Sequence, residues 1–206
     1  MKNVTDRIRN PFGMDPPCDQ FVSGYGDANA HFHVVGDHPG VHGGAATGVP
    51  FTNVPGRRLQ RALAEAGLFT SVGDRPGVER TFLSYLHGCV VDGKPSPAEY
   101  TEMERYFDAE LRAIAAHVLL PVGERATRHV LGTYTAEDAT GDLEPIYYTE
   151  LRGGGWLVLP VREPSEWEEG EADRLVAALT ELQRTDYRRE SDLGRFLAGE
   201  ESYFVR

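Results

Sequence analysis

Four short apolar runs, each followed by a segment with helical periodicity, most constrain how this chain can fold. The runs at 32–36, 81–86, 118–122 and 156–159 have the length of strands, and a glycine or proline stops each one. Apolar stripes predict helices at 56–67, 97–117, 123–131 and 171–184. Because strands that alternate with helices favour a parallel sheet covered on both faces, we predict an α/β fold: a three-layer αβα sandwich around a four-stranded parallel sheet.

The length of 206 residues suits one domain with a substantial core, and we expect the whole chain to form it. Residues 1–30 read as a polar lead-in with several prolines and glycines. Residues 186–206 mix charges and aromatic rings, and we expect them to dock onto the domain as a C-terminal extension.

The stretch from Gly36 to Gly40 carries the strongest local sign of a functional site. It follows a buried strand and reads Gly-Asp-His-Pro-Gly, so Asp37 and His38 come at the carboxyl end of that strand. Ligands of open parallel sheets bind in the crevice beyond such ends, which makes Asp37 a candidate site residue. The alternative is an ordinary turn in which Asp37 caps the next element.

The charge of the chain bears on its surroundings. The net charge is −11, and only Lys2 and Lys94 among the 21 basic residues are lysines. We expect such a composition in a protein from a salt-rich cytoplasm. In molar salt the Debye length is about 3 Å, so an acidic surface is not repelled by DNA at longer range. The alternative is an acidic protein from a GC-rich genome, which favours arginine over lysine.

Other classes of protein find little support in the sequence. No run reaches the roughly 20 apolar residues that span a bilayer, and the N-terminus lacks the apolar core of a signal peptide, so we expect a cytoplasmic protein. Cys18 and Cys89 lie far apart and form no Cys-x-x-Cys pair, so we expect free thiols. The histidines at positions 31, 33, 38 and 42 include a His-x-His pair with workable zinc spacing, but the sequence offers no further ligands and a structural role is favoured.

Several of these pieces together resemble the uracil-DNA glycosylase superfamily, and most closely its family 4. The resemblance runs from about residue 18 to 167 and rests on the order and spacing of Gly36–Gly40, Gly48–Phe51, Gly56–Leu59, Ser96–Glu99, the segment 121–131 and the approach to Pro160. It implies a monomeric DNA glycosylase that hydrolyses the N-glycosidic bond of a flipped uracil or other deaminated base.

The resemblance also implies roles for individual residues. Asp37 would orient water at the anomeric carbon, and Phe51 would stack on the base, unless Phe51 only anchors the glycine-rich loop in the core. The backbone around Gly36, Pro39 and Gly40 would form the floor of the base pocket. Residues that would meet the DNA backbone are Arg57, Arg58 and Ser165, with Arg61 as a further candidate.

Two departures from the family pattern bear on specificity. Glu163 stands where the family has a histidine that donates to the leaving base, and an ionised carboxylate there would oppose an anion unless it is protonated or neutralised by Arg162. Arg162 or His38 could take over the role of the missing histidine. Ser84 and Tyr85 stand where the family has a base-reading asparagine, and a tyrosine cannot both donate to and accept from a uracil edge as an amide does.

A third departure concerns the iron–sulfur cluster of family 4. Cys18 and Cys89 match two of its four cysteines, whereas Phe21 and Met103 stand in place of the others. Two thiolates cannot hold a cubane cluster, so we predict no cofactor and core packing around these four residues.

Two alternatives to an active glycosylase stay open. A non-catalytic member of the same fold could bind DNA lesions or nucleobases, which the changes at Glu163 and Tyr85 would allow. An unrelated hydrolase of small molecules could use a similar α/β scaffold, since fold alone does not fix chemistry.

Overall fold

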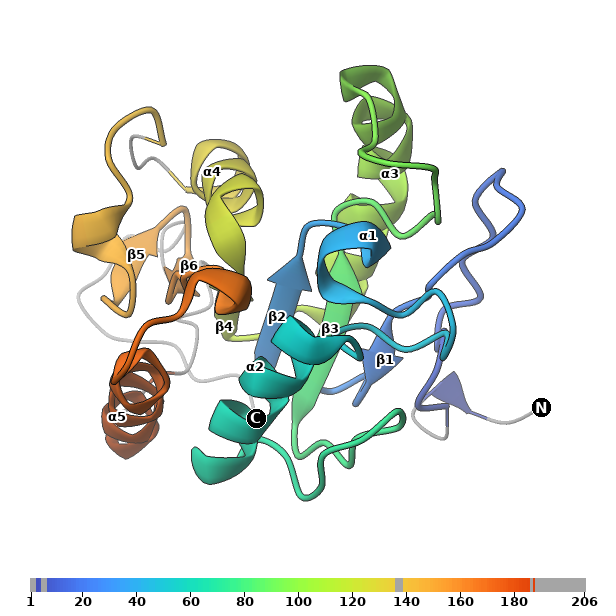
Figure 1. Ribbon diagram of the computed structural model, residues 1–206. Coiled ribbons are helices and arrows are strands. Elements are labelled where there is room, and N and C mark those ends of the chain that lie inside the picture. Colours follow the sequence, from blue (N-terminus) through green and yellow to red (C-terminus); the bar gives the residue numbers. More distant parts are fainter. Residues whose placement is uncertain (1–2, 5–6, 136–138, 186, 188–206) are drawn as a thin grey trace, which may run out of the picture.

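The protein is built around a six-stranded sheet with the strand order β1-β3-β2-β4-β6-β5 (Figure 1). The computed structural model describes residues 3–4, 7–135, 139–185 and 187. The four central strands are β3 (Thr81–Tyr85), β2 (Phe32–Gly36), β4 (Val118–Pro121) and β6 (Trp156–Val158), and they are parallel to one another. These are the four strands predicted from the apolar runs.

Two short edge strands make the sheet mixed rather than purely parallel. Strand β1 (Tyr25–Gly26) pairs with β3 and β5 (Leu151–Gly153) pairs with β6, both antiparallel. The predicted parallel sheet of four strands is therefore correct for the centre and incomplete at its edges.

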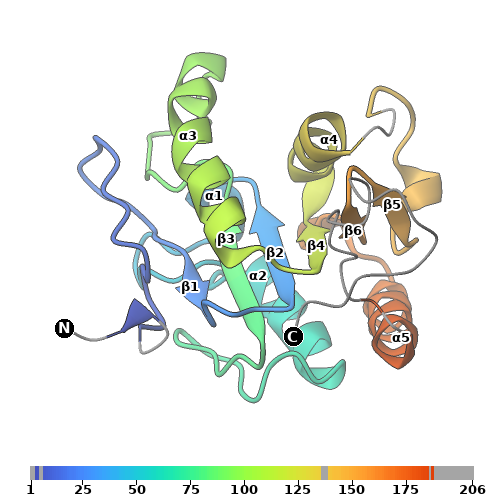
Figure 2. The ribbon, with the colours of Figure 1, turned by 180° about the vertical axis from the view of Figure 1, so that it is seen from behind.

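Helices cover both faces of the sheet, so the predicted three-layer arrangement is confirmed (Figures 1 and 2). Helices α2 (Val54–Glu65) and α5 (Glu171–Arg184) lie on one face, where they share a core with Val34, Leu83 and Leu120. Helices α3 (Pro97–Ile114) and α4 (Gly123–Tyr134) lie on the other face, around Val35 and Leu119. The alternation of these buried strand residues follows from side chains pointing to opposite faces along a strand.

The short elements lie near the carboxyl ends of the central strands. Helix α1 (Pro39–His42) follows β2 directly, and a 3₁₀ turn, η3 (Pro164–Glu166), follows β6. A second 3₁₀ turn, η2 (Glu144–Ile146), precedes β5. The parallel strands bring the loop after β2 and the loop after β6 to the same end of the sheet, which is the end where a ligand is expected.

The local signals of α3 are those that the sequence predicts. Ser96 accepts a hydrogen bond from the Glu99 amide while the Glu99 side chain accepts one from the Ser96 amide, and Pro97 occupies the first turn. The helix ends at Ile114, three residues earlier than predicted, because Ala115 adopts the left-handed conformation that terminates helices. Among the described residues, none of the helices is long and apolar enough to cross a bilayer.

Candidate functional site

A cleft of about 900 Å³ opens at the carboxyl end of the sheet, between α3 and α4. Asp37 and Val41 line it from the loop after β2, and Glu163 and Glu166 line it from the loop after β6. Other residues on its walls include Leu86, Tyr100, Phe107, Arg125, Arg128 and Tyr147. The structure therefore brings the two predicted carboxylates, Asp37 and Glu163, to one cavity although 126 positions separate them in the sequence.

Asp37 is held in the cleft by groups from both flanking helices. The Tyr100 hydroxyl of α3 donates a hydrogen bond to its Oδ1, and Nε of Arg125 from α4 lies 3.8 Å from its Oδ2. The Arg125 guanidinium also lies 4.3 Å from the centre of the Tyr100 ring. Burial and the hydrogen bond to Asp37 raise the pKa of Tyr100, so this hydroxyl is a donor throughout the physiological range. One oxygen of Asp37 thus accepts a hydrogen bond from Tyr100, and the other lies near the Arg125 guanidinium.

The backbone of Asp37 is fixed as well. Its carbonyl accepts a hydrogen bond of 3.0 Å from the His87 amide, and its own amide donates to Nδ1 of His42 at 3.3 Å. Because these hydrogen bonds fix both the amide and the carbonyl of Asp37, its side chain has a defined position at the end of β2.

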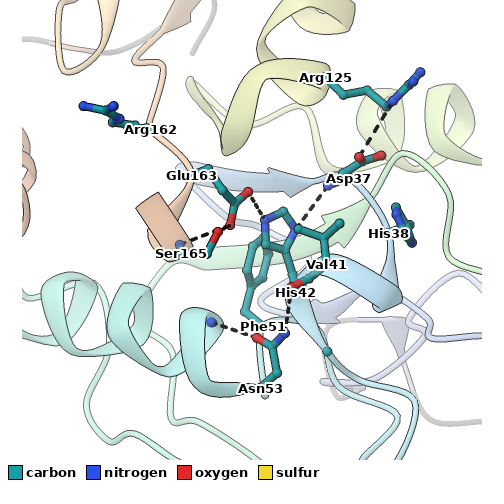
Figure 3. Close-up of polar contacts among 12 residues, drawn as sticks. Asp37, His38, Val41, His42, Phe51, Asn53, Arg125, Arg162, Glu163 and Ser165 are labelled. Atoms are coloured by element: carbon teal, nitrogen blue, oxygen red, sulfur yellow. Dashed lines mark hydrogen bonds and ion pairs between the residues drawn. The ribbon is translucent and has the colours of Figure 1, made fainter. Parts of the chain in front are cut away.

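His42, the last residue of α1, links the two carboxylate loops (Figure 3). Its side chain is fully buried, and Nε2 lies 2.9 Å from Oε2 of Glu163. Since Nδ1 accepts the Asp37 amide hydrogen, the ring proton of a neutral His42 sits on Nε2 and is donated to Glu163. His42 therefore joins the backbone of Asp37 to the side chain of Glu163.

Glu163 presents an ionised carboxylate to the cleft. Its Oε1 accepts hydrogen bonds from the Ser165 amide at 3.4 Å and the Ser165 hydroxyl at 3.3 Å. Burial raises the pKa of Glu163, but the hydrogen bond from His42, the electrostatic attraction to His42 and the hydrogen bonds from Ser165 outweigh this effect and bring the pKa below its usual value. Arg162 does not neutralise this charge, because its guanidinium pairs with Glu144 at 3.4 Å. An anionic leaving base would be tolerated if Glu163 were protonated or if Arg162 paired with it. Neither condition is met in the structure.

Gly123 makes room for this carboxylate at the start of α4. A Cβ on Gly123 would lie 2.8 Å from Oε2 of Glu163, and the residue has a φ of +81°. A glycine is required at this position both for its backbone conformation and for the approach of Glu163.

Phe51 and Tyr85 are packed beneath the cleft rather than exposed in it. Phe51 is 1% exposed, and its ring centre lies 5.0 Å from that of His42 and 5.4 Å from that of Tyr85. The Tyr85 hydroxyl accepts from the Phe51 amide at 2.7 Å and donates to the Gly43 carbonyl at 2.9 Å. In this conformation Phe51 has the position of a core anchor, and the Tyr85 hydroxyl is committed to the loop.

The glycine and proline residues of the loop shape this packing. A Cβ on Gly36 would lie 2.7 Å from Cζ of Phe51 and 2.8 Å from Cδ1 of Tyr85, so only glycine fits. Pro39 is the first residue of α1, and Gly40 donates its amide hydrogen to Nδ1 of His38 at 3.1 Å. His38 is therefore the N-cap of α1, and its ring does not take the position beside Glu163 that His42 occupies.

The predicted DNA-contacting arginines lie on α2 and have different partners. Arg58 donates to the carbonyls of Pro164 and Trp167 at 2.9 and 3.0 Å, which ties α2 to the η3 loop. Arg57 pairs with Asp74 at 2.5 Å, whereas Arg61 is exposed. Ser165 is exposed and bonded to Glu163. In this conformation both hydrogen bonds of Arg58 go to main-chain carbonyls of the protein.

The prediction of free thiols is wrong, because Cys18 and Cys89 form a disulfide. The bond joins the N-terminal lead-in to the loop after β3, with the two Cα atoms 6.1 Å apart. No local pattern in the sequence indicates this pairing, since the two cysteines are 71 positions apart. Met103 and Cys89 are buried, with Sδ of Met103 3.7 Å from Sγ of Cys89, and Phe21 pairs with Cys89 as a bridge. Cys18 and Phe21 are only partly buried, so the predicted core packing holds for Cys89 and Met103.

The two histidines of the His-x-His pair have structural surroundings. Nε2 of His33 lies 2.7 Å from the Ser84 hydroxyl inside the sheet, and His31 contacts Tyr187, the one described residue of the C-terminal extension. The rest of the predicted extension, Asp186 and 188–206, falls outside the described residues. Within the described part of the chain, no group of three or more His, Cys, Asp or Glu side chains is placed to hold a metal ion.

Three residues of the site were not predicted as such from the sequence. From the sequence, Tyr100 belongs to the apolar stripe of its helix, Arg125 lies in no motif, and His42 is a candidate only as a metal ligand. The one available signal was the place of Tyr100 and Arg125 in the first turns of helices that follow strands, where side chains lie near the carboxyl end of the sheet.

Comparisons with known proteins agree with this architecture. Residues 23–183 match the family model of the uracil DNA glycosylase superfamily. The chain is 34% identical over 157 residues to the type-5 uracil-DNA glycosylase of Thermus thermophilus, a match that covers 73% of this chain and 72% of the relative. This relative belongs to type 5, so the finer likeness to family 4 stays a prediction. Both findings support a DNA glycosylase, which is a hydrolase, and the chain belongs to the uracil-DNA glycosylase superfamily.

Proposed function

We propose that this protein hydrolyses the N-glycosidic bond of a damaged base flipped out of DNA, a uracil or another deaminated base, and that Asp37 is its catalytic carboxylate. The observation that carries this proposal is the position of Asp37 in a cleft at the end of β2, with Tyr100 bonded to one carboxylate oxygen and Arg125 near the other. The family match and the name of the relative support the reaction class.

Asp37 acts on the sugar side of the scissile bond. Breaking the bond develops positive charge on the sugar, which an adjacent carboxylate stabilises while it orients and deprotonates the attacking water. The bond from Tyr100 leaves the second oxygen of Asp37 for this water, and the fixed backbone of Asp37 keeps the geometry constant. Arg125 lies at the exposed rim beside Asp37, where it is placed to meet the phosphate next to the flipped nucleotide.

Glu163 and the cleft walls form the base side of the site. Glu163 reaches the cleft from the loop after β6, and Tyr100, Phe107 and Tyr147 offer aromatic surface for stacking. Phe51 supports this pocket from below through His42, and the backbone at Gly36, Pro39 and Gly40 supplies the floor. We assign DNA-backbone contact to Arg57, Arg61 and Ser165 ahead of Arg58. Arg61 and Ser165 are exposed and Arg57 pairs with an exposed Asp74, whereas both hydrogen bonds of Arg58 go to main-chain carbonyls.

A second candidate function is binding of a lesion without cleavage. The ionised Glu163 favours it, because a carboxylate in place of the family's histidine gives no donor to an anionic leaving base. The two functions share the pocket and differ in the chemical step.

Cleavage of defined lesions separates the two. Duplex and single-stranded oligonucleotides with one uracil, hypoxanthine or xanthine are incubated with the protein in molar potassium chloride, and abasic sites are cleaved with alkali and counted. The glycosylase proposal expects product from at least one lesion. Tight lesion binding by folded protein without any product would favour the binding function instead.

A further inference from the structure

Among the described residues, Glu163 forms no ion pair with a lysine or an arginine. His42 is its one ion-pair partner there; Nδ1 of His42 accepts the Asp37 amide hydrogen, and Nε2 lies 2.9 Å from Oε2 of Glu163. Arg162 turns to Glu144, and Arg58 bonds to backbone carbonyls of the same loop. The carboxylate is therefore bonded and oriented without a lysine or an arginine to compensate its charge.

The protein holds this charge at the cleft with several independent contacts. Oε2 accepts the His42 Nε2 hydrogen and Oε1 accepts two hydrogens of Ser165. A carboxylate offers about four acceptor positions, so one position stays available for a group in the cleft. Gly123 leaves the space for this arrangement, and Arg58 holds the loop from the other side.

A carboxylate of this kind discriminates between leaving bases by their charge. A neutral base such as uracil departs as an anion, and Glu163 opposes that anion. A base that already carries a positive charge departs neutral, so Glu163 stabilises the bound substrate and does not oppose the leaving base. Acidic side chains outnumber basic ones around the cleft, with Glu104, Glu124, Asp142, Glu144 and Glu166 beside Asp37 and Glu163, against Lys94, Arg125 and Arg128.

We infer that the site takes a cationic purine, N-alkylated or protonated on the ring, and that Glu163 is the residue that selects it. This inference rests on the proposed glycosylase function and extends its substrate class beyond deaminated bases. The aromatic walls fit the same class, since a cation is attracted to a ring face, as the Arg125 guanidinium already is to the Tyr100 ring.

The reaction balances without any further reagent. The electron pair of the C1′–N bond passes to the ring nitrogen and cancels the positive charge of the purine, which leaves as a neutral molecule. Water supplies the hydroxyl group of the new C1′–OH bond, and its proton passes to Asp37 and from there to solvent. Glu163 stays ionised throughout.

Binding of nucleosides tests the inference without relying on activity. Affinities for 7-methylguanosine, a cation at pH 6, and for guanosine, which is neutral, are measured by calorimetry in the lowest salt that keeps the protein folded. We expect the wild type to prefer the cation by about tenfold or more, a ratio that corresponds to about 1.4 kcal/mol. Glu163→Gln should reduce the preference to about threefold or less. The matched control is Glu169→Gln, which removes a charge from an exposed position outside the cleft lining and should keep the wild-type ratio.

Three results would overturn the inference: equal affinities in the wild type, binding of neither nucleoside, or a preference for the cation that persists in Glu163→Gln. A parallel assay follows release of 7-methylguanine, hypoxanthine and uracil from oligonucleotides, with the alkylated purine expected to be fastest and uracil slowest. If the cation preference holds but no base is released, the glycosylase proposal fails while the assignment of Glu163 stands.

Discussion

Replacing Arg58 by alanine tests how the loop that carries Glu163 is held in place. The guanidinium donates to the carbonyls of Pro164 and Trp167, at 2.9 and 3.0 Å, and lies 5.8 Å from the centre of the Trp167 ring. A hydrogen bond that involves a charged group contributes about 1.5–3 kcal/mol, but Arg58 is only half-buried and water competes for both carbonyls. We therefore expect Arg58→Ala to lower the free energy of unfolding by about 2–3 kcal/mol.

Thermal and urea unfolding measure this effect. In a chain of this length, 1 kcal/mol shifts the midpoint by about 2–4 °C, so the variant should melt about 5–10 °C below the wild type. Arg61→Ala is the matched control, since it removes the same charge from an exposed position on the same helix and should change stability by less than about 0.5 kcal/mol.

The salt dependence of DNA binding tests whether Arg58 contacts DNA instead of holding the loop. A side chain that contacts phosphate contributes about one unit to the slope of log affinity against log salt, and its removal lowers that slope. Arg58→Ala should leave the slope of the wild type unchanged. A lower slope together with wild-type stability would show that Arg58 meets DNA and would refute its role in holding the loop.

Three further predictions concern other parts of the structure. The Cys18–Cys89 disulfide closes a long loop, so Cys18→Ser with Cys89→Ser should lower the free energy of unfolding by about 4 kcal/mol in urea titrations, and equal stability with and without reductant in the wild type would contradict it. Glu110 is fully buried and its pKa is raised to about 8, so stability should fall as the pH rises from 4.5 to 8, and Glu110→Gln should abolish that dependence in unfolding measured across this range. Tyr100→Phe removes the donor to Asp37, and single-turnover cleavage should slow by about tenfold or more with lesion affinity unchanged; a wild-type rate would contradict the assigned contact.

The fold was predictable because its signals are local and repeated. Each central strand has an apolar run with a clear stop, and Ser96–Glu99 marks the start of α3 by its capping box. The edge strands β1 and β5 are two and three residues long, which is too short for a periodic signal. Their pairing depends on the neighbouring strands rather than on their own sequence.

The site was predictable only where one loop contains the chemistry. Asp37 stands out because a buried strand ends at the glycine before it and a proline and a second glycine follow it. The partners of Asp37 and Glu163 come from distant segments: Tyr100 lies 63 positions from Asp37, and His42 lies 121 positions from Glu163. No local sequence pattern predicts contacts between such distant residues, and the Cys18–Cys89 disulfide was unpredictable for the same reason.

The central claim is that Asp37 performs hydrolysis of a glycosidic bond, and single-turnover kinetics tests it most directly. Abasic-site formation is timed with wild type, Asp37→Asn and Asp142→Asn on the best lesion substrate in molar potassium chloride, with lesion affinity measured in parallel. Asp142 lines the same cleft and is exposed, so it controls for the loss of one negative charge. Loss of a catalytic carboxylate should lower the rate by about 10²–10⁴-fold in Asp37→Asn, with affinity retained and Asp142→Asn near wild type. A wild-type rate in Asp37→Asn would contradict the account.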